Sequence, residues 1–474
     1  MNAGRGTGQV GRGSIIVIDI GKTLSKVTLW NGDGRLLDRQ VRPNQPCVVD
    51  GLRRLDAAGI AAWLLDTLAR YRDRGVATII PVGHGASVVA LAADGPACAP
   101  LDYEQPIPAD ILAAYRAARD PFAQTGSPAL PDGLNLGAQL FWLDRLYPET
   151  RGATLLPWAQ YWAWLLTGRA VSEVTSLGCH SDLWNPGEGR FSALARREGW
   201  ASRFAPLVRA GDVVGTLSPA IAARTGLSEA VEVLAGLHDS NAALLAARGF
   251  DEIARKEATI LSTGTWFIAM RMPDAAVFTG ALSEARDCLV NVDAYGRPVP
   301  SARFMGGREI ETVIGIDTRR VDIRPDQPAL LAAVPNLLEH GAMLLPTLAP
   351  GCGPFPASRG EWVHPPEDWI ERRAAACLYA ALVADVSLDL IGSRDRLLVE
   401  GRFAEAEVFV RALASLRPDT EVMVANAHND VSFGALRLVD PTLKPQGALR
   451  RVEPLPHDLG AYRAAWRMAA GEPA

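Results

Sequence analysis

The chain has 474 residues, of which 48% are hydrophobic and 21% charged, and its net charge is −5. This composition is ordinary for a globular protein, and the length suggests two or three domains. The negative balance and the lack of Lys/Arg runs argue against a nucleic-acid partner. No apolar run reaches the roughly 18 residues that span a bilayer, so we expect no membrane role.

The six cysteines are scattered without a CxxC pair, which argues against a zinc site or a disulfide framework and fits the reducing cytoplasm. The glycine-rich start lacks the apolar segment of a secretion signal, and we predict a flexible tail over residues 1–13. Within it, Gly6–Gly11 spells GxGxxG. A dinucleotide fingerprint must follow a strand and open a helix, whereas this match precedes a strand, so we interpret it as part of the tail.

The first elements predict a β-hairpin followed by more sheet. Apolar, β-branched runs at 15–20 and 26–30 read as strands, and Asn31-Gly32-Asp33-Gly34 is a strong turn signal. Hydrophobic periodicity then predicts, in chain order, a helix over 51–74, strands at 77–82 and 87–92, and helices over 135–147 and 158–166.

A similar hairpin recurs in the middle of the chain. A strand at 231–234 and a helix over 240–248 precede strands at 258–261 and 266–270, which meet at a small polar turn. Two such hairpins about 245 residues apart suggest two related halves, although so short a repeat can also arise by chance. We predict an N-terminal domain over 14–247 and a C-terminal domain over 248–474.

The second half alternates helices and strands, which indicates an α/β protein. Its expected elements are a helix over 369–391, a strand at 396–399, a turn at 400–402, a helix over 404–416, a strand at 421–424 and a helix over 429–439.

Gly21-Lys22-Thr23 looks like the end of a P-loop, GxxxxGK[ST]. That motif requires a glycine at position 16, where this chain has Ile16, and a helix after the lysine. Here the chain returns as a strand, so the P-loop interpretation fails on both counts.

The first hairpin loop still has groups that suit a phosphate. It combines a glycine that permits close approach, two hydroxyls and two ammonium groups: Gly21, Thr23, Ser25, Lys22 and Lys26. Asp19 ends an apolar strand and could hold Mg²⁺ directly or through water. The alternative is an ordinary polar turn with a solvated aspartate.

The second hairpin loop and the turn before it can each be read as a ligand-binding segment or as an ordinary structural one. Ser262-Thr263-Gly264-Thr265 suits a second phosphate or forms a plain turn. Asp239 follows a strand and opens a helix, so it is either an N-cap or a general base at the edge where open α/β sheets bind ligands.

Three segments taken together carry a resemblance to a known family: 19–26 (DIGKTLSK), 236–243 (GLHDSNAA) and 261–266 (LSTGTW). Their order, with the duplicated hairpin, resembles the FGGY family of carbohydrate kinases, within the actin-like ATPase superfamily, over about residues 15–440. Within that family the chain looks most like the rhamnulokinase and fuculokinase branch, through 166–168 (LTG), Thr175-Ser176 and 262–266.

The resemblance implies an α/β fold of two ribonuclease-H-like domains with a central cleft, sugar on the N-terminal domain and ATP mostly on the C-terminal one. It implies that Asp239 is the catalytic base and that Asp19 and Asp239 hold Mg²⁺. The implied phosphate and nucleotide contacts come from the two hairpin loops and a later turn: Gly21, Lys22, Thr23, Ser25, Lys26, Ser262, Thr263, Gly264, Thr265, Glu400, Gly401, Arg402 and Phe403.

The chain also departs from the family pattern. The adenosine segment is usually richer in glycine than Glu400-Gly401-Arg402-Phe403, and Gln160-Tyr161 replaces a more usual Asp-Tyr. Because polyols need convergent donors and acceptors, the sugar candidates are His84, Gly85, Glu104, Gln105, Gln160, Tyr161, His180, His238 and Asp239, although any one of them can equally be a structural residue. For Trp158, Trp162 and Trp164 we favour core packing over sugar stacking.

The sequence therefore predicts an ATP- and Mg²⁺-dependent cytoplasmic kinase that phosphorylates a hydroxyl of a rhamnulose-, fuculose- or xylulose-like ketose, or of a polyol. Two alternatives remain: an actin-like ATPase switch and a sugar-binding pseudokinase, against which Asp239 argues. A homodimer is an expectation at family level.

Overall fold

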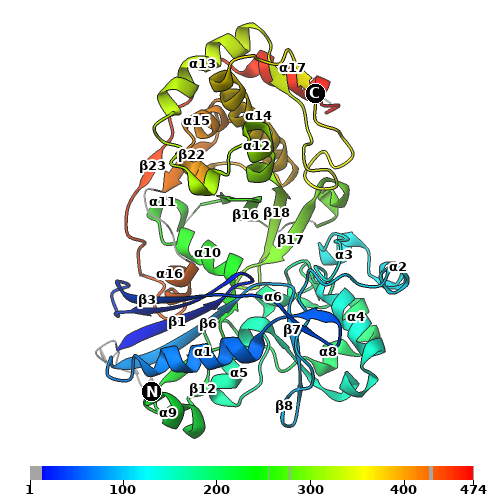
Figure 1. Ribbon diagram of the computed structural model, residues 1–474, viewed down its shortest axis with the longest axis vertical. Coiled ribbons are helices and arrows are strands. Elements are labelled where there is room, and N and C mark those ends of the chain that lie inside the picture. The colour runs from blue at the N-terminus through cyan, green and yellow to red at the C-terminus, as the bar shows by residue number, and fades with distance from the viewer. Residues whose placement is uncertain (1–12, 255, 276, 278, 426–430, 473–474) are drawn as a thin grey trace, which may run out of the picture.

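The computed structural model describes residues 13–254, 256–275, 277, 279–425 and 431–472. The GxGxxG match and all but the last residue of the predicted tail lie outside these ranges. Two seven-stranded sheets dominate the fold (Figure 1). No helix among the described residues has the length and apolarity needed to cross a membrane.

The first sheet has the order β12-β13-β6-β1-β2-β3, and β14 also pairs with β6. Its strands are β12 (Val213–Thr216), β13 (Glu232–Leu234), β6 (Val76–Gly83), β1 (Ser14–Ile20), β2 (Leu24–Trp30), β3 (Leu36–Pro43) and β14 (Leu237–His238). The chain runs antiparallel from β1 through β2 to β3, whereas β6 and β13 lie parallel on the other side of β1. The predicted opening hairpin and its continuation into the sheet are confirmed.

The second sheet repeats this pattern with the order β17-β18-β16-β15-β21-β22-β23. Its strands are β17 (Cys288–Val292), β18 (Pro298–Phe304), β16 (Phe267–Met272), β15 (Ala258–Thr263), β21 (Arg396–Gly401), β22 (Glu421–Ala425) and β23 (Leu449–Arg451). β15, β16 and β18 are antiparallel, while β21 and β22 lie parallel beside β15. The five central strands of each sheet thus share one order and direction, which supports the interpretation of two related halves.

Helices cover both faces of the first sheet. α1 (Ala57–Ala69) and α5 (Trp158–Thr167) pack on one face, and α10 (Asp239–Ala247) and α16 (Val431–Leu436) pack on the other, between the two halves (Figure 1). α16 lies between β22 and β23 of the second sheet in sequence, yet its Phe433 packs on Trp30 of the first sheet, with ring centroids 6.2 Å apart. The proposed boundary at residue 248 therefore cuts through a region where both halves of the chain share one core.

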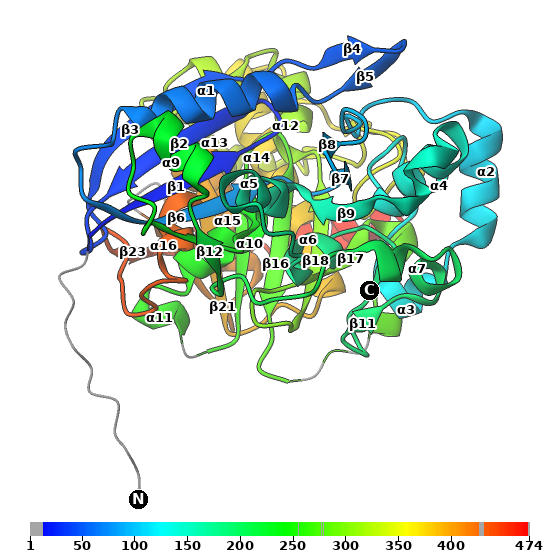
Figure 2. The same ribbon diagram turned by 90° about the horizontal axis from the view of Figure 1, so that it is seen from below.

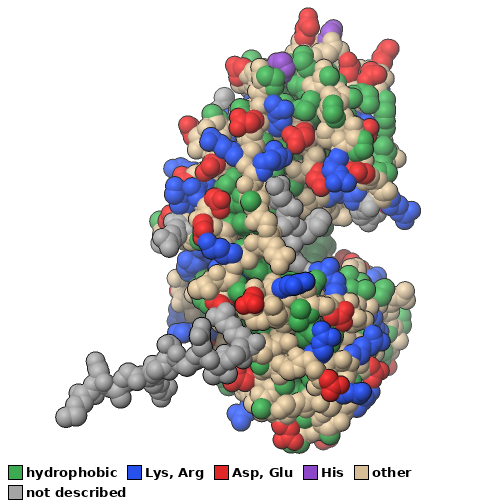
Figure 3. Space-filling model, turned by 90° about the vertical axis from the view of Figure 1, so that its left-hand side faces the viewer, with side chains coloured by type: hydrophobic (Ala, Val, Ile, Leu, Met, Phe, Trp, Pro, Cys, Tyr) green, Lys and Arg blue, Asp and Glu red, His purple; other side chains and the backbone are tan. Residues whose placement is uncertain are grey.

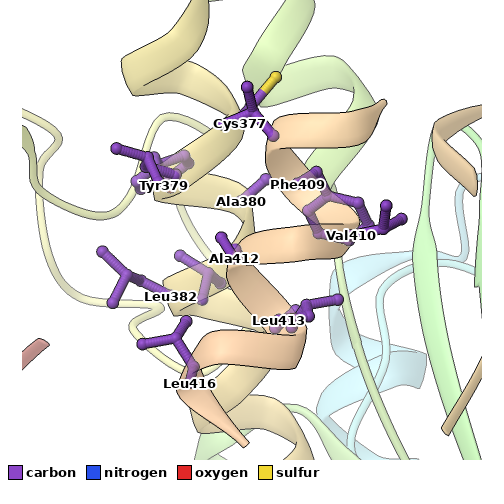
Figure 4. Close-up of a cluster of buried hydrophobic side chains, with 14 of the residues drawn as sticks. Cys377, Tyr379, Ala380, Leu382, Phe409, Val410, Ala412, Leu413 and Leu416 are labelled. Atoms are coloured by element: carbon purple, nitrogen blue, oxygen red, sulfur yellow. The ribbon is translucent and has the colours of Figure 1, made fainter. Parts of the chain in front are cut away.

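The second half has its own apolar core. The fully buried side of α14 (Trp369–Leu390) packs against α15 (Glu407–Leu416), and Leu382 and Leu416 lie between the two helices (Figure 4). α12 (Gly306–Ile314) and α13 (Gln327–Glu339) pack on α14 as well. The predicted helix over 369–391 is confirmed.

Two predicted helices begin later than expected. The helix predicted from Gly51 starts at Ala57, because the Asp56 carboxylate caps it, and Leu52–Arg54 instead forms strand β5 against β4 (Cys47–Val49), which projects from the body (Figure 2). The helix predicted from Ala404 starts at Glu407, after a 3-10 turn over Arg402–Glu405. Of the helix predicted over 429–439, only Val431–Leu436 is helical among the described residues.

Candidate active site

Three parallel strands of the first sheet end in register at one edge. Ile20 of β1 lies opposite Gly83 of β6, and Gly83 in turn lies opposite His238 of β14. Ile20 and His238 are therefore two strands apart, about 10 Å at ordinary strand spacing, and Asp19 and Asp239 stand next to them at the same edge. Open α/β sheets bind their ligands at this edge, and the surface is hollowed between the two halves of the molecule (Figure 3).

Asp239 is the first residue of α10, and the N-cap position belongs to His238. The N-cap interpretation of Asp239 is therefore wrong, since its Oδ1 accepts a hydrogen bond from the adjacent Ser240 amide at 2.6 Å and reaches no later amide of the helix. Its side chain is 33% exposed. The carboxylate is therefore accessible to a ligand.

The loop that carries Asp239 is held by buried neighbours. The His238 amide donates to Thr175 Oγ1 at 2.9 Å, and the Gln160 amide nitrogen donates to the carbonyls of Ala235 and Gly236, each at 3.1 Å. Gly236 has a φ of +76°, and a Cβ there would lie 2.0 Å from the Pro81 carbonyl oxygen. Gln160, expected as a sugar contact, thus fixes the backbone of the Asp239 loop.

His238 is buried beside Asp239, with its Nε2 3.2 Å from Oδ1. Burial works to lower the pKa of His238, but the Cys179 thiol and the Asp239 carboxylate outweigh it and raise this pKa above its ordinary value. Nearby, burial raises the pKa of the Glu173 carboxyl to about 7, against the hydrogen bonds from Thr175. The base candidate therefore borders a buried set of titratable groups.

His84 follows β6 and lies at the same edge. Burial lowers its pKa to about 4, so the imidazole is neutral at physiological pH. Its Nδ1 lies 2.8 Å from the Gly85 carbonyl oxygen, which can only accept, so the proton sits on Nδ1 and leaves Nε2 as an acceptor. A Cβ on Gly85 would lie 2.8 Å from His238 Nε2, which explains the glycine between the two histidines.

Lys22 points toward an acidic pair. Its ammonium is bonded to the fully buried Asp102 carboxylate, lies 3.6 Å from Glu104 and sits 4.6 Å from the centre of the Tyr103 ring. Arg53 of β5 binds the same two carboxylates at 2.9 and 2.7 Å. From the sequence we predicted Glu104 as a sugar contact but neither Arg53 nor Asp102. For Asp102, the signal in the sequence was the close spacing of two carboxylates in 102–104 (DYE).

Some of the other side chains of the first hairpin loop are bonded to neighbouring residues, whereas that of Thr23 is exposed to solvent. Lys26 Nζ lies 2.7 Å from Asp19 Oδ2, directly across the two strands. Ser25 is buried and donates to Asn44 Oδ1 at 2.9 Å, while Asn44 donates to the Gly21 carbonyl at 2.8 Å. Thr23 is exposed. Of the two hydroxyls expected near phosphate, only that of Thr23 is accessible.

The second hairpin loop presents Ser262, Gly264 and Thr265 at the surface. Thr263 between them is buried and donates to the Glu400 carbonyl at 2.5 Å, while it accepts from the Phe403 amide at 3.0 Å. The structure thus brings the predicted phosphate loop and the predicted adenosine segment together.

The adenosine segment itself is closely packed on this loop. Gly401 is exposed with a φ of +85°, and a Cβ there would lie 2.2 Å from the Thr263 carbonyl oxygen. Arg402 donates to the Val321 carbonyl at 3.3 Å. Phe403 is buried against Phe267, with centroids 5.1 Å apart, so its ring belongs to the core.

The remaining sugar candidates lie near the same edge with different exposures. Gln105 Oε1 accepts from the Arg53 amide at 2.6 Å, and Tyr161 stacks on Trp158 with centroids 5.7 Å apart. His180 is partly exposed, and its Nδ1 lies 2.8 Å from the Leu134 carbonyl oxygen. Trp158 and Trp162 are almost fully buried in the core and Trp164 packs against it, so the preference for core packing is confirmed.

The described residues contain no group of three or more His, Cys, Asp and Glu side chains arranged to hold a metal ion. Asp19 and Asp239 nevertheless fit a magnesium ion that is bound mainly through a nucleotide, because such sites use one or two carboxylates together with substrate phosphates. The exposed glycine and hydroxyls at 262–265 fit the phosphates themselves.

A model of the C-terminal domain of carbohydrate kinase FGGY matches residues 255–446. Among solved structures, a carbohydrate kinase from Novosphingobium aromaticivorans is 70% identical, with 98% of this chain and 99% of that chain covered and a TM-score of 0.95. A xylulose kinase from Rhodospirillum rubrum shares the fold at 19% identity and a TM-score of 0.80, with 97% of this chain and 98% of that chain covered. The chain belongs to the FGGY family of carbohydrate kinases, as the resemblance predicted, and has the family's two-domain, actin-like fold.

Curated relatives match over part of their length. The chain is 26% identical to the L-fuculokinase of Escherichia coli (strain K12) over 327 residues, which are 63% of this chain and 65% of that protein. It is 25% identical to a probable L-xylulose kinase of Pasteurella multocida (strain Pm70) over 274 residues, 53% and 54% of the two chains. The matched region thus spans just under two thirds of the L-fuculokinase.

Proposed function

We propose that this protein transfers the γ-phosphate of ATP to a hydroxyl of a ketose or a related polyol. The observation that carries the proposal is the carboxylate of Asp239, a third exposed at the carboxyl edge of the first sheet and next to two buried histidines. Such a carboxylate can accept the proton of a sugar hydroxyl as the oxygen attacks phosphorus.

The sugar would lie on the first half of the molecule. His84 Nε2 offers an acceptor, and the exposed Glu104 and the partly exposed His180 offer polar groups around the same edge. Beside these groups, the Asp102 carboxylate forms ion pairs with both Lys22 and Arg53, which adds a charged surface to the site. A ketose or polyol fits this site because its hydroxyls can both donate and accept.

The nucleotide would lie against the second half. Ser262, Gly264 and Thr265 would meet the phosphates, Gly401 would allow adenosine to approach the backbone, and Thr23 would meet the phosphates from the opposite hairpin. Mg²⁺, held through Asp19 and Asp239 together with the phosphates, would neutralise the charge that builds up during transfer. Closure of the two halves would exclude water, which competes as phosphoryl acceptor.

Two properties complete the proposal. A cytoplasmic location is supported by the cysteines, since none of the six, all of them in described segments, forms a disulfide. A homodimer remains an expectation that light scattering of the purified protein tests.

The experiment is ADP release from Mg-ATP across a panel of ketoses, aldoses and polyols. We expect release that requires one ketose or polyol. Hydrolysis that does not depend on any sugar would instead indicate an ATPase switch, and complete silence with retained sugar binding would indicate a pseudokinase.

A further inference from the structure

A loop next to the base candidate has an unusual backbone. It runs over 179–182, between α6 (Val174–Leu177) and β10 (Trp184–Asn185). His180 has a φ of +38° and Asp182 a φ of +62°, so two non-glycine residues lie in the left-handed region. Such a backbone is unfavourable for a residue with a side chain and persists where contacts around it fix its conformation.

Contacts to Asp182 fix one end of this loop. Its buried carboxylate accepts from Tyr115 Oη at 2.5 Å and from Arg119 at 3.2 Å (Nε) and 3.0 Å (Nη2). Its amide donates to Ser127 Oγ at 3.0 Å, and Arg119 also donates to the Ser127 carbonyl. Arg119 is therefore the residue that ties Asp182 to its surroundings most extensively.

Arg119 also reaches the second half of the molecule. Its Nη1 lies 2.9 Å from Oε1 of Glu284, a residue just ahead of β17 in the second sheet. The same oxygen accepts from the Ala129 amide at 2.8 Å, and the Val290 amide donates to the Gly126 carbonyl at 2.8 Å. Glu284 thus connects two segments of the first half to the second sheet.

The other end of the loop reaches the base. Cys179 is buried, and α6, just before it, carries Thr175, whose Oγ1 accepts a hydrogen bond from the His238 amide at 2.9 Å. His238 Nε2 in turn lies 3.2 Å from Asp239. A continuous series of contacts therefore leads from Glu284, through Arg119 and the loop, to the carboxylate of Asp239.

We propose that Arg119 is a positioning residue that couples the placement of the second half, sensed through Glu284, to the conformation of the Asp239 loop. When the two halves lie as observed, Glu284 fixes the guanidinium, and the guanidinium fixes Asp182. The left-handed loop then fixes the end of α6, where Thr175 holds the His238 amide. The catalytic consequence rests on the proposed kinase function, whereas the structural coupling does not.

The test uses Glu284→Ala in the full-length chain, because removing Arg119 would strand the buried Asp182 carboxylate and threaten folding. The control is Glu407→Ala: the Glu407 side chain is 32% exposed against 35% for Glu284, and its ion pair with Arg450, at 3.2 Å, lies within the second half. The first readout is amide hydrogen exchange of segments 179–183 and 237–240 in the ligand-free protein. We expect at least fivefold faster exchange in Glu284→Ala and no change in Glu407→Ala.

Unchanged exchange in Glu284→Ala, or equal acceleration in both variants, overturns the coupling whatever the protein catalyses. The second readout is steady-state kinetics with the sugar found active. We expect kcat to fall about tenfold in Glu284→Ala, with the sugar dissociation constant changed less than twofold, and Glu284→Gln to keep at least half of kcat because its oxygen still accepts both bonds. A kcat within twofold of wild type in Glu284→Ala overturns the positioning role, whereas absence of sugar-dependent turnover in the wild type overturns the kinase proposal alone.

Discussion

Nε2 of His238 lies 3.2 Å from Oδ1 of Asp239, at the first turn of α10. Although burial opposes a charge on this imidazole, Cys179 and Asp239 raise its pKa, so it carries a proton at neutral pH. At this distance the imidazolium forms an ion pair with the Asp239 carboxylate and helps to hold it in place for proton transfer.

His238→Gln should therefore lower kcat by about tenfold, within the range of such interactions. Because the pKa of His238 is raised, its charge persists above pH 6.5 and is lost as the pH rises further, so wild-type kcat should decline on the alkaline side. The pH profile of kcat for both proteins checks this. An identical alkaline decline in the variant would contradict the assignment.

His84 should make the free energy of unfolding depend on pH, with the loss on the acid side. Burial lowers its pKa from 6.5 to about 4. The unfolded chain then binds the extra proton first, so stability present at neutral pH is lost as the pH falls from about 6.5 toward 4, by on the order of 3 kcal/mol. Urea unfolding at several pH values should show a shallower acid loss in His84→Gln. His340→Gln, at an exposed position, is the control and should unfold like wild type.

The two lysines of the first hairpin should have separable effects. Lys22 is bonded to Asp102 beside His84, whereas Lys26 lies 2.7 Å from Asp19. Lys22→Met should raise the KM for sugar by about tenfold and leave the KM for ATP within twofold, since one polar contact to a charged group is worth about 1.5 kcal/mol. Lys26→Met should instead lower the Mg²⁺ concentration needed for half-maximal rate, because it removes a positive charge 2.7 Å from the Asp19 carboxylate. If Lys22→Met raised the KM for ATP, the result would contradict this assignment and indicate that Lys22 contacts the phosphates.

The packing of α10 on α16 depends on Gly434. A Cβ there would lie 1.7 Å from the Ala242 carbonyl oxygen, so Gly434→Ala must separate the two helices. We expect a loss of about 3 kcal/mol in the free energy of unfolding. Gly152→Ala is the matched control, because its added Cβ meets nothing within 4 Å and should change stability by less than about 0.5 kcal/mol. Equal effects of the two substitutions in urea unfolding would contradict this role of Gly434.

Much of the fold follows from short-range patterns. The strands at 15–20 and 258–263 are rich in β-branched residues, whereas the strand at 396–401 is an apolar run of Leu397, Leu398 and Val399. Their burial in parallel or hairpin pairs matches these patterns. The late start of α15 could not be predicted, because it depends on a bond between the Phe403 amide and Thr263, which are 140 residues apart.

The side chains around the sheet edge were harder to predict than the edge itself. Lys22 was predicted near phosphate because of its charge in the hairpin loop, and only the folded chain brings Asp102, 80 residues later, against its ammonium. Gln160 looked like a sugar ligand, yet both of its amide bonds go to the carbonyls before Leu237. Such assignments depend on tertiary contacts that neither spacing nor periodicity contains.

The most direct test of the account is sugar-dependent ADP release by Asp239→Asn, measured beside ATP binding by the same preparation. If Asp239 is the base, turnover should fall at least 10²-fold, while the ATP dissociation constant stays within about threefold, because the amide keeps the size of the carboxylate. Near-wild-type turnover of the variant would contradict the assignment of Asp239.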